Sequence, residues 1–309
     1  MKKNKKILVL LLFLVLILTG CTTQLKDSDN NVVKNEKTGQ NLTENIICRP
    51  TSKEAIKLYE ANGVDLEKLP DCKKMQLSGN YEGIWTNIFI RPLAILLINV
   101  GKNIGSYALS IILISIVIRL ISYPLTRKTA MQSESMKEAQ PEIQRVQKKY
   151  GDKKDQESMT KQSQEMMAIY KKYNINPLSG CLFSLIQLPI LLAFFEAIQR
   201  TPALFEDKFL GLQLGTVPAV GISSPTFYMY IILMLLIGAT TYFSFKLNMA
   251  GNPTMDGNMK MMPIIMTGMI IVMGVFMPSA LGIYWITTNV FAIVQSILVK
   301  RSKKKNGKA

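Results

Sequence analysis

Apolar residues are gathered along the chain into long blocks, and short polar segments separate these blocks. The block that begins at Tyr107 is interrupted by one charged residue, Arg119, and it leads to Pro124 and the basic pair Arg127 and Lys128. A helix rises about 1.5 Å per residue, so roughly 20 residues cross the hydrocarbon core of a bilayer. We therefore predict an all-α integral membrane protein with five transmembrane helices in a core of residues 107–299, the other four being Leu178–Ile198, Phe227–Phe245, Met262–Met277 and Ile283–Val299.

The stretch Ile84–Val100 is apolar enough to suggest a further span, but Arg91-Pro92 and two asparagines interrupt it. If it crossed the bilayer, the basic loop from Arg127 to Tyr173 would lie outside, against the preference of Lys and Arg for the cytoplasm. We therefore predict an amphipathic helix over residues 84–101 that lies flat in the outer interface. The first span then runs inward, and the basic tail at 300–309 lies in the cytoplasm with the C-terminus.

The basic loop 127–173 is itself amphipathic and is broken at Gly151-Asp152. A short break between two helical arms predicts an antiparallel hairpin that projects into the cytoplasm. Its charges are of both signs, which argues against a nucleic-acid-binding stripe, although a merely solvated hairpin stays open. The apolar positions at helical spacing are Met131, Ala139, Ile143, Val146 and Tyr150 on the first arm and Met159, Met166, Ile169, Tyr170 and Tyr173 on the second.

Residues 1–20 have the pattern of a signal peptide, because four lysines precede the short apolar run Ile7–Leu18. The run ends in Leu18-Thr19-Gly20-Cys21, which resembles the lipobox of bacterial lipoproteins. That resemblance implies a lipid attached to Cys21 and an N-terminus outside the cell membrane. An uncleaved signal anchor with an unrelated cysteine is the alternative.

Residues 21–83 would then form an extracytoplasmic tether. The part from Thr22 to Thr43 is polar and predicts disorder. Thr51 and Glu54 have the spacing of a capping box, so a short helix is expected from there to Asn62. Cys48 and Cys72 bracket this helix, and outside the cell they could form a disulfide or remain two free thiols.

Composition narrows the function. The chain has 309 residues, 48% of them hydrophobic and 19% charged, and it contains no histidine. Histidine-dependent triads and the H-E-x-x-H zinc site are therefore excluded, and we find no P-loop, no G-x-S-x-G elbow and no zinc spacing of cysteines. We expect a protein that is not an enzyme and needs no metal or cofactor. The net charge of +16 is concentrated on particular loops, and membrane topology explains this distribution better than nucleic-acid binding does. We therefore expect no direct DNA binding.

Polar side chains on three predicted spans share one depth. Arg119 lies about 12 Å, Gln187 about 14 Å and Asn289 about 16 Å from the cytoplasmic end of its span, and Thr288 extends the set. Snorkelling of the arginine and ordinary interhelical hydrogen bonds are the alternatives. The predicted spans carry no Asp or Glu at this depth. A buried arginine among neutral amides predicts a wet groove that opens to the cytoplasm.

The fourth predicted span carries methionines at spacings of 4, 3, 4 and 4 residues, which places their thioethers on one helix face. Such stripes usually fill gaps between helices, but they also form surfaces that bind varied apolar partners. We treat the stripe as a client-contact candidate. Its members are Met262, Met266, Met269, Met273 and Met277.

Short motifs of polar, aromatic and proline residues follow one another in a fixed order: Ile118-Arg119-Leu120, Tyr123-Pro124-Leu125-Thr126, Gln140-Pro141-Glu142-Ile143, Asn176-Pro177-Leu178, Gly180-Cys181, Gln187-Leu188-Pro189-Ile190, Tyr284-Trp285 and Thr288-Asn289. In these motifs, over about residues 82–301, the chain resembles the YidC/Oxa/Alb family of membrane protein insertases. The lipobox and the absence of a large extracytoplasmic domain resemble the five-span form of Gram-positive bacteria.

The resemblance implies insertion of nascent single- and double-span proteins into the membrane, alone or beside the Sec translocon. It assigns Arg119 to a positively charged groove, and Gln187 and Trp285 to the lining of that groove. The hairpin and the basic tail would receive ribosomes or targeting factors, and membrane lipids would surround the spans. The Cys48–Cys72 segment lies outside the family's pattern.

Two other classes of function compete with this interpretation. A small-solute transporter would be expected to show internal repeats and coupling carboxylates, and the sequence has neither. An assembly lipoprotein without insertase activity would have no use for a buried arginine such as Arg119.

Overall fold

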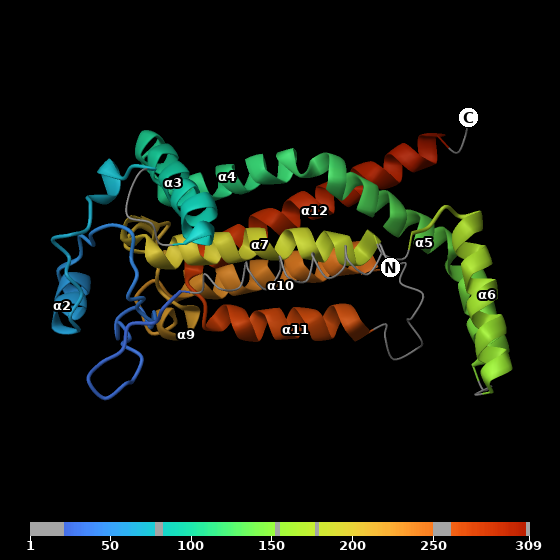
Figure 1. Cartoon of the computed structure of the whole chain (residues 1–309), viewed down its shortest axis with the longest axis horizontal. Coiled ribbons are helices and arrows are strands. Elements are labelled where there is room, and N and C mark those ends of the chain that lie inside the picture. The colour runs from blue at the N-terminus through green and yellow to red at the C-terminus, as the bar shows by residue number, and fades with distance from the viewer. Residues whose placement is uncertain (1–21, 78–82, 152–154, 177–178, 250–260, 307–309) are drawn as a thin grey trace. The chain divides into compact units, whose positions relative to one another are not determined.

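The computed structural model describes residues 22–77, 83–151, 155–176, 179–249 and 261–306 (Figure 1). The predicted signal peptide and Cys21 lie outside the described residues. The chain folds as two compact units. Unit 1 comprises residues 1–115, 187–235 and 272–285, and unit 2 comprises residues 116–186, 236–271 and 286–309.

Long helices occur at all the predicted spans and pass from one unit to the other. These helices are α4 (Tyr107–Ile121), α7 (Ser179–Arg200), α10 (Phe227–Met249), α11 (Met262–Val275) and α12 (Ser279–Asn306). Among the described residues, Tyr107–Tyr150, Phe227–Asn248 and Ser279–Lys303 are long and apolar enough to cross a membrane, and Met262–Val275 is a shorter apolar helix. The all-α integral membrane fold is confirmed, whereas the number of helices that cross the membrane stays a prediction.

The N-terminal arm of unit 1 (residues 22–75) is folded, including the stretch Thr22–Thr43 for which the composition predicted disorder. At one level of the arm the Leu25 amide donates to the Leu42 carbonyl, the Leu42 amide to Val33 and the Val33 amide to Leu25, each at 2.9 Å. Leu25 and Leu42 are buried with Ile46, Ala55, Tyr59 and Leu66. The prediction was wrong because a few apolar residues, spaced far apart in the sequence, meet in one small core.

The short helix α2 (Lys53–Ala61) begins one residue later than the capping-box spacing suggested. Its N-cap is Ser52, whose side chain accepts a hydrogen bond from the Ala55 amide. The backbone amide and hydroxyl of Thr51 instead donate to the Glu206 carboxylate. Cys72 is the first residue of the 3-10 helix η1 (Cys72–Lys74), and it forms a disulfide with Cys48 that closes this part of the arm.

The disulfide packs against Ile98 of α3 (Arg91–Ile104), with Tyr107 and Ala203 also in contact with this buried cluster. Helix α3 follows a π-helical turn, η2 (Thr86–Ile90), and ends at Gly105, whose φ of 79° requires the left-handed conformation that glycine tolerates. The stretch Thr86–Ile104 meets the length and composition of a span. The flat position in the outer interface therefore stays a prediction that rests on the charge distribution.

The segment between α7 and α10 is more ordered than a plain loop. It contains α8 (Pro202–Phe205), a two-stranded antiparallel ribbon of β1 (Lys208–Phe209) and β2 (Leu212–Gln213), and α9 (Pro218–Gly221). The Val217 amide donates to the Thr38 carbonyl, and the Ser279 amide donates to Thr216. Unit 1 thus joins this segment to the N-terminal arm and to the start of α12.

Unit 2 contains the predicted antiparallel hairpin, built from α5 (Tyr123–Tyr150) and α6 (Gln156–Lys172) (Figure 1). Its core contains five predicted positions, Ala139, Ile143, Val146, Tyr150 and Ile169, together with Ile175. Met131 and Met159 were predicted to join this core, but they are 41% and 54% exposed. Met159 lies in the first turn of α6, next to the break between the arms, and Met131 lies toward the opposite end of the hairpin.

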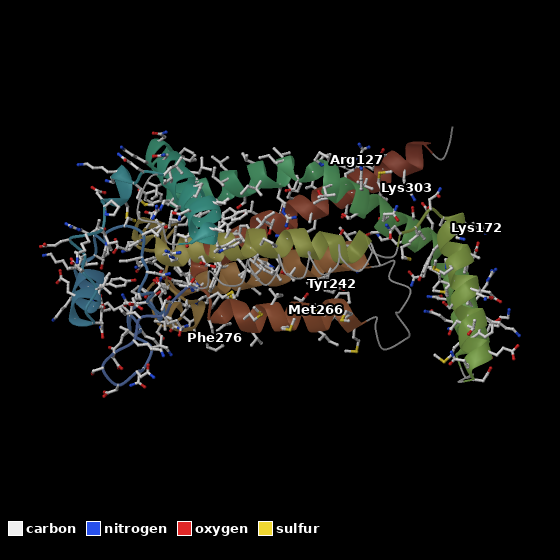
Figure 2. All side chains as sticks on the ribbon, viewed as in Figure 1. Arg127, Lys172, Tyr242, Met266, Phe276 and Lys303 are labelled. Atoms are coloured by element: carbon white, nitrogen blue, oxygen red, sulfur yellow. A yellow bond between two sulfur atoms is a disulfide. The ribbon has the colours of Figure 1, made fainter. Side chains whose placement is uncertain are left out.

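The two arms of the hairpin are also joined by matched polar contacts. Glu142 accepts from Lys172 at 2.6 Å and from the Tyr173 hydroxyl at 2.9 Å, while Glu165 accepts from Lys149 at 2.6 Å and from the Tyr150 hydroxyl at 2.9 Å. Figure 2 labels Lys172 at the end of α6. The lysine most strongly, and the tyrosine hydroxyl after it, holds the pKa of each glutamate below its usual range.

Candidate functional site

Arg119 lies in the part of α4 that belongs to unit 2, and only 9% of it is exposed. Its helix is otherwise apolar from Tyr107 to Ile121 except for serine. The charge is therefore held inside an apolar helix rather than on a solvated face. Burial of this kind is costly for an arginine unless polar groups or water surround it.

Polar contacts within unit 2 join α12 to α10 along one face. Asn289 donates to the Thr241 hydroxyl at 3.0 Å, and seven residues later the Ser296 hydroxyl donates to the Asn248 side chain at 2.8 Å. Thr241 is also seven residues before Asn248, so the two helices run in the same direction at this contact. Asn289 is therefore a polar member of an interhelical layer.

A second face of α12 reaches α5. Gln295 donates to the Thr126 hydroxyl at 2.9 Å, and both side chains are buried. Thr288 is also buried, with 5% of its surface exposed. The sequence of the unit 2 segments 116–126, 236–249, 262–271 and 286–299 contains no Asp or Glu and only two cations, Arg119 and Lys246. Among the described residues of these segments, the buried polar side chains are thus neutral hydroxyls and amides, with Arg119 as the buried cation.

Unit 1 holds the other two residues predicted for the groove. Gln187 of α7 is partly buried, and its amide donates to the Tyr284 hydroxyl at 3.1 Å. The Tyr284 ring, 1% exposed, stacks on Phe194 with ring centroids 4.4 Å apart. Trp285 follows Tyr284 on α12 and is partly buried.

The predicted groove residues therefore fall into two sets. Arg119, Thr288 and Asn289 lie in unit 2, while Gln187 and Trp285 lie in unit 1. A single groove that contains all five stays a prediction. The sequence indicated Thr126 and Tyr284 only as parts of family motifs and not as polar partners. Thr241 was missed, although it is a polar group inside the otherwise apolar helix α10 and could have been found by that signal.

The methionine stripe lies along α11 and just beyond its end. Met269 and Met273 are 50% and 45% exposed, whereas Met262, Met266 and Met277 are partly buried (Figure 2 labels Met266). The neighbouring residues Ile264, Ile265 and Val272 are exposed as well, at 55%, 59% and 63%. Within unit 2, α11 approaches α10 closely at Gly238, where an added Cβ would lie only 3.0 Å from the Ile271 side chain. Exposure on α11 thus extends beyond the stripe, and the role of the stripe stays a prediction.

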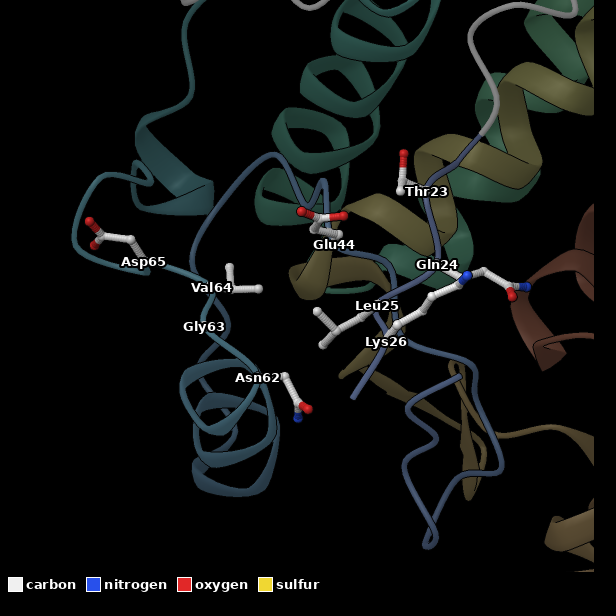
Figure 3. A pocket seen from close by; sticks show the side chains of 9 residues that line it. All are labelled: Thr23, Gln24, Leu25, Lys26, Glu44, Asn62, Gly63, Val64 and Asp65. Carbon is white, nitrogen blue, oxygen red and sulfur yellow. The ribbon is translucent and has the colours of Figure 1, made fainter. Parts of the chain in front are cut away.

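A cavity of about 550 Å³ lies in the N-terminal part of unit 1 (Figure 3). Its lining combines both charge signs with amides and contains none of the predicted groove residues. Within the described residues, no cluster of three or more His, Cys, Asp or Glu could hold a metal ion. The cavity is lined by Thr23, Gln24, Leu25, Lys26, Glu44, Asn62, Gly63, Val64 and Asp65.

Apolar helices of membrane-spanning length and a buried neutral polar layer define a multi-pass membrane protein. The family described as 60Kd inner membrane protein matches residues 99–306. The membrane protein insertase MisCA of Bacillus subtilis is 40% identical over 74% of this chain and 83% of its own length. The membrane protein insertase YidC of Oceanobacillus iheyensis is 38% identical over 73% of this chain and 87% of its own length.

The chain therefore belongs to the family of the YidC membrane protein insertases, as its motifs predicted, and is a multi-pass bacterial membrane protein. A solved structure described as an active YidC insertase with the first transmembrane domain resolved has a similar fold, with a TM-score of 0.50 and 20% identity. The similarity covers 79% of this chain and 50% of that chain, so this chain spans about half the length of the solved protein.

Proposed function

We propose that this chain is a membrane protein insertase, which binds nascent membrane proteins and helps them enter the bilayer and fold. The proposal is supported by the relatives, which carry this name at about 40% identity over most of both chains. The observation that carries the mechanism is the buried Arg119 on α4. On the membrane helices of unit 2, the other buried side chains among the described residues are mostly neutral and polar.

In this mechanism a water-filled groove opens to the cytoplasm and is lined by Arg119, Gln187, Trp285, Thr288 and Asn289. A client's extracytoplasmic polar segment enters the groove without meeting dry hydrocarbon. Arg119 attracts acidic residues of that segment, because charges interact more strongly where water screens them poorly. In this mechanism the chain binds the client and moves its segments between water and the membrane, and no catalytic residue is required.

The charge of Arg119 is tested by complementation of a depleted strain, with protease protection of a tagged client as the readout. Arg119→Lys should keep much of the activity, because the clients differ and no fixed bidentate geometry can serve all of them. Arg119→Ala and Arg119→Glu should lose insertion of clients with acidic translocated tails. Neutralising those tails should make insertion less sensitive to the substitution. Full insertion by Arg119→Glu at normal protein levels would contradict the electrostatic mechanism.

The methionine stripe of α11 is proposed to touch the apolar part of a client. Flexible, polarisable thioethers adapt to varied apolar surfaces. Photocrosslinkers at Met266, Met269 and Met273 should therefore form adducts with a stalled nascent chain. Adducts that form only from Ile265 and Ile271 would mean that the methionines merely fill gaps between helices.

The remaining assignments complete the proposal. The chain has its N-terminus outside, is anchored by a lipid on Cys21 and has its C-terminus in the cytoplasm. The hairpin and the basic tail receive ribosomes or targeting factors, and some clients arrive from the Sec translocon. Depletion of the chain, followed by a survey of the membrane proteins that fail to insert, measures the breadth of this activity.

A further inference from the structure

Two charged residues are buried at the C-terminal end of α7, within unit 1. Glu196 is 6% exposed and Arg200 is fully buried, the largest fully buried side chain among the described residues. A fully buried arginine requires polar partners, so its contacts indicate what it holds in place.

Arg200 connects α7 to two segments that are remote in the sequence. Its Nε donates to the Asn45 carbonyl at 2.7 Å, and its guanidinium also donates to the Thr86 hydroxyl at 2.9 Å. The Arg200 carbonyl in turn accepts from the Ile47 amide at 2.9 Å. The N-terminal arm and the π-helical turn η2 are therefore both fixed to the end of α7.

Glu196 adds a second contact one helical turn earlier. Its carboxylate accepts from the Trp85 indole at 3.0 Å, and Trp85 is 5% exposed. Residues 85 and 86 thus contact α7 at two successive levels. Two levels of contact fix the direction of a helix, whereas a single level would leave it free to pivot.

At the end near Gln187, this part of α7 is weakened by a proline. Pro189 lies inside the helix two residues after Gln187, and a proline removes one backbone hydrogen bond and distorts its helix. The helix alone therefore does not determine how its segment 190–200 is directed relative to Gln187. The buried contacts at Glu196 and Arg200 supply the missing constraint.

We propose that Arg200 is a positioning residue for the client groove: with Glu196 it clamps α7 to the N-terminal arm and to η2, and so fixes how α7 presents Gln187 beside the Pro189 break. This inference rests on the proposed insertase function. It also gives the N-terminal arm a role. The arm lies outside the residues 99–306 that match the family, whereas α7 lies within them.

The test compares Arg200→Met with Lys208→Met, which removes an exposed basic residue eight positions later. Photoreactive residues replace Leu188, next to Gln187, or Val290, next to Asn289; both positions are 45% exposed. The probe is a stalled ribosome–nascent chain of a single-span client with an acidic translocated tail. Arg200→Met should lower the adducts from position 188 several-fold, leave those from position 290 unchanged, and be partly rescued by Arg200→Lys. Lys208→Met should change neither.

Equal loss from both positions would reduce Arg200 to a general stabilising role, and unchanged adducts from position 188 would overturn the clamp. Hydrogen exchange of the purified full chain gives a readout that does not depend on insertion. Arg200→Met should accelerate exchange in residues 43–47 and 190–200 but not in 236–249. If Arg200→Met fails to accumulate, Glu196→Gln gives the same comparison at milder cost. An unmodified chain that inserts no client would refute the proposed function, while hydrogen exchange would still decide whether the clamp exists.

Discussion

The helices that pass through both units bury different side chains in each. In unit 1 their buried positions are mostly apolar, as with Ile111 of α4, Phe194 and Ile198 of α7 and Tyr284 of α12. In unit 2 the buried positions on the membrane helices are mostly polar, and among the described residues they are Arg119, Thr126, Thr241, Thr267, Thr288, Gln295 and Ser296, with Ile237 and Val299.

The difference separates two tasks along the same helices. Unit 1 packs large apolar and aromatic groups, and it also contains the disulfide and the hydrogen-bonded charged residues at the end of α7. Unit 2 relies on interhelical hydrogen bonds, which contribute only about 0.6 kcal/mol each in membranes. A polar interior of low packing energy would suit the proposed groove, which has to accept water and a client. The apolar interior of unit 1 suits a fixed framework.

The largest expected effect comes from opening a hole in unit 1. Phe194→Ala should destabilise the folded protein by about 3 to 4 kcal/mol, because it removes a fully buried ring stacked on Tyr284 and leaves a cavity. Thr241→Val in unit 2 should cost about 0.6 kcal/mol, since it removes one interhelical hydrogen bond. Reversible unfolding of the full chain in bicelles measures both. Equal costs would remove the contrast between the units.

Removing the disulfide of the N-terminal arm should have the next largest effect. Replacing Cys48 and Cys72 together by serine should destabilise residues 22–75 by about 3 kcal/mol, because the unfolded arm gains chain entropy. Protease digestion of the arm in right-side-out vesicles should then proceed faster, with the hairpin unaffected. Ready labelling of both thiols in intact cells without reductant would contradict the bond.

The smallest effect concerns the hairpin and depends on pH. Because the folded pKa of Glu142 and Glu165 is lowered, their ion pairs stabilise the hairpin fully above the unfolded glutamate pKa of about 4.3. This contribution is lost as the pH falls through the lower folded values. Spin labels at Gln144 and Gln164 should show a broader distance distribution below that range.

The charge-neutral variant Glu142→Gln with Glu165→Gln should show the broad distribution already at neutral pH. Glu157→Gln is the matched control, because Glu157 pairs with Lys161 on its own helix and does not join the arms. A distribution that stays narrow in the double variant would mean that the apolar core alone holds the hairpin. Such exposed pairs contribute little in general, which is why this effect is placed last.

Long apolar blocks and regular helical spacing were interpreted correctly from the sequence, whereas structure built from residues without regular spacing was not. The apolar blocks gave the helices, and the amphipathic arms gave the hairpin with most of its core. The fold of the N-terminal arm escaped prediction because Leu25, Val33 and Leu42 have no periodic spacing and interact only through closure of the chain. Arg200 was missed because a charge near a helix end normally indicates solvent, and its burial depends on segments more than 100 residues away.

The ring of hydrogen bonds in the N-terminal arm limits how the arm can interact with unfolded polypeptides. Leu25, Val33 and Leu42 donate their amides to one another, so at this level the described arm offers no row of vacant donors to an extended polypeptide. Unpaired strand edges recruit other chains into sheets. A protein that handles unfolded segments meets such chains continually. Because these backbone groups are paired within the arm, extended substrates cannot add to it as extra strands and draw it into aggregates.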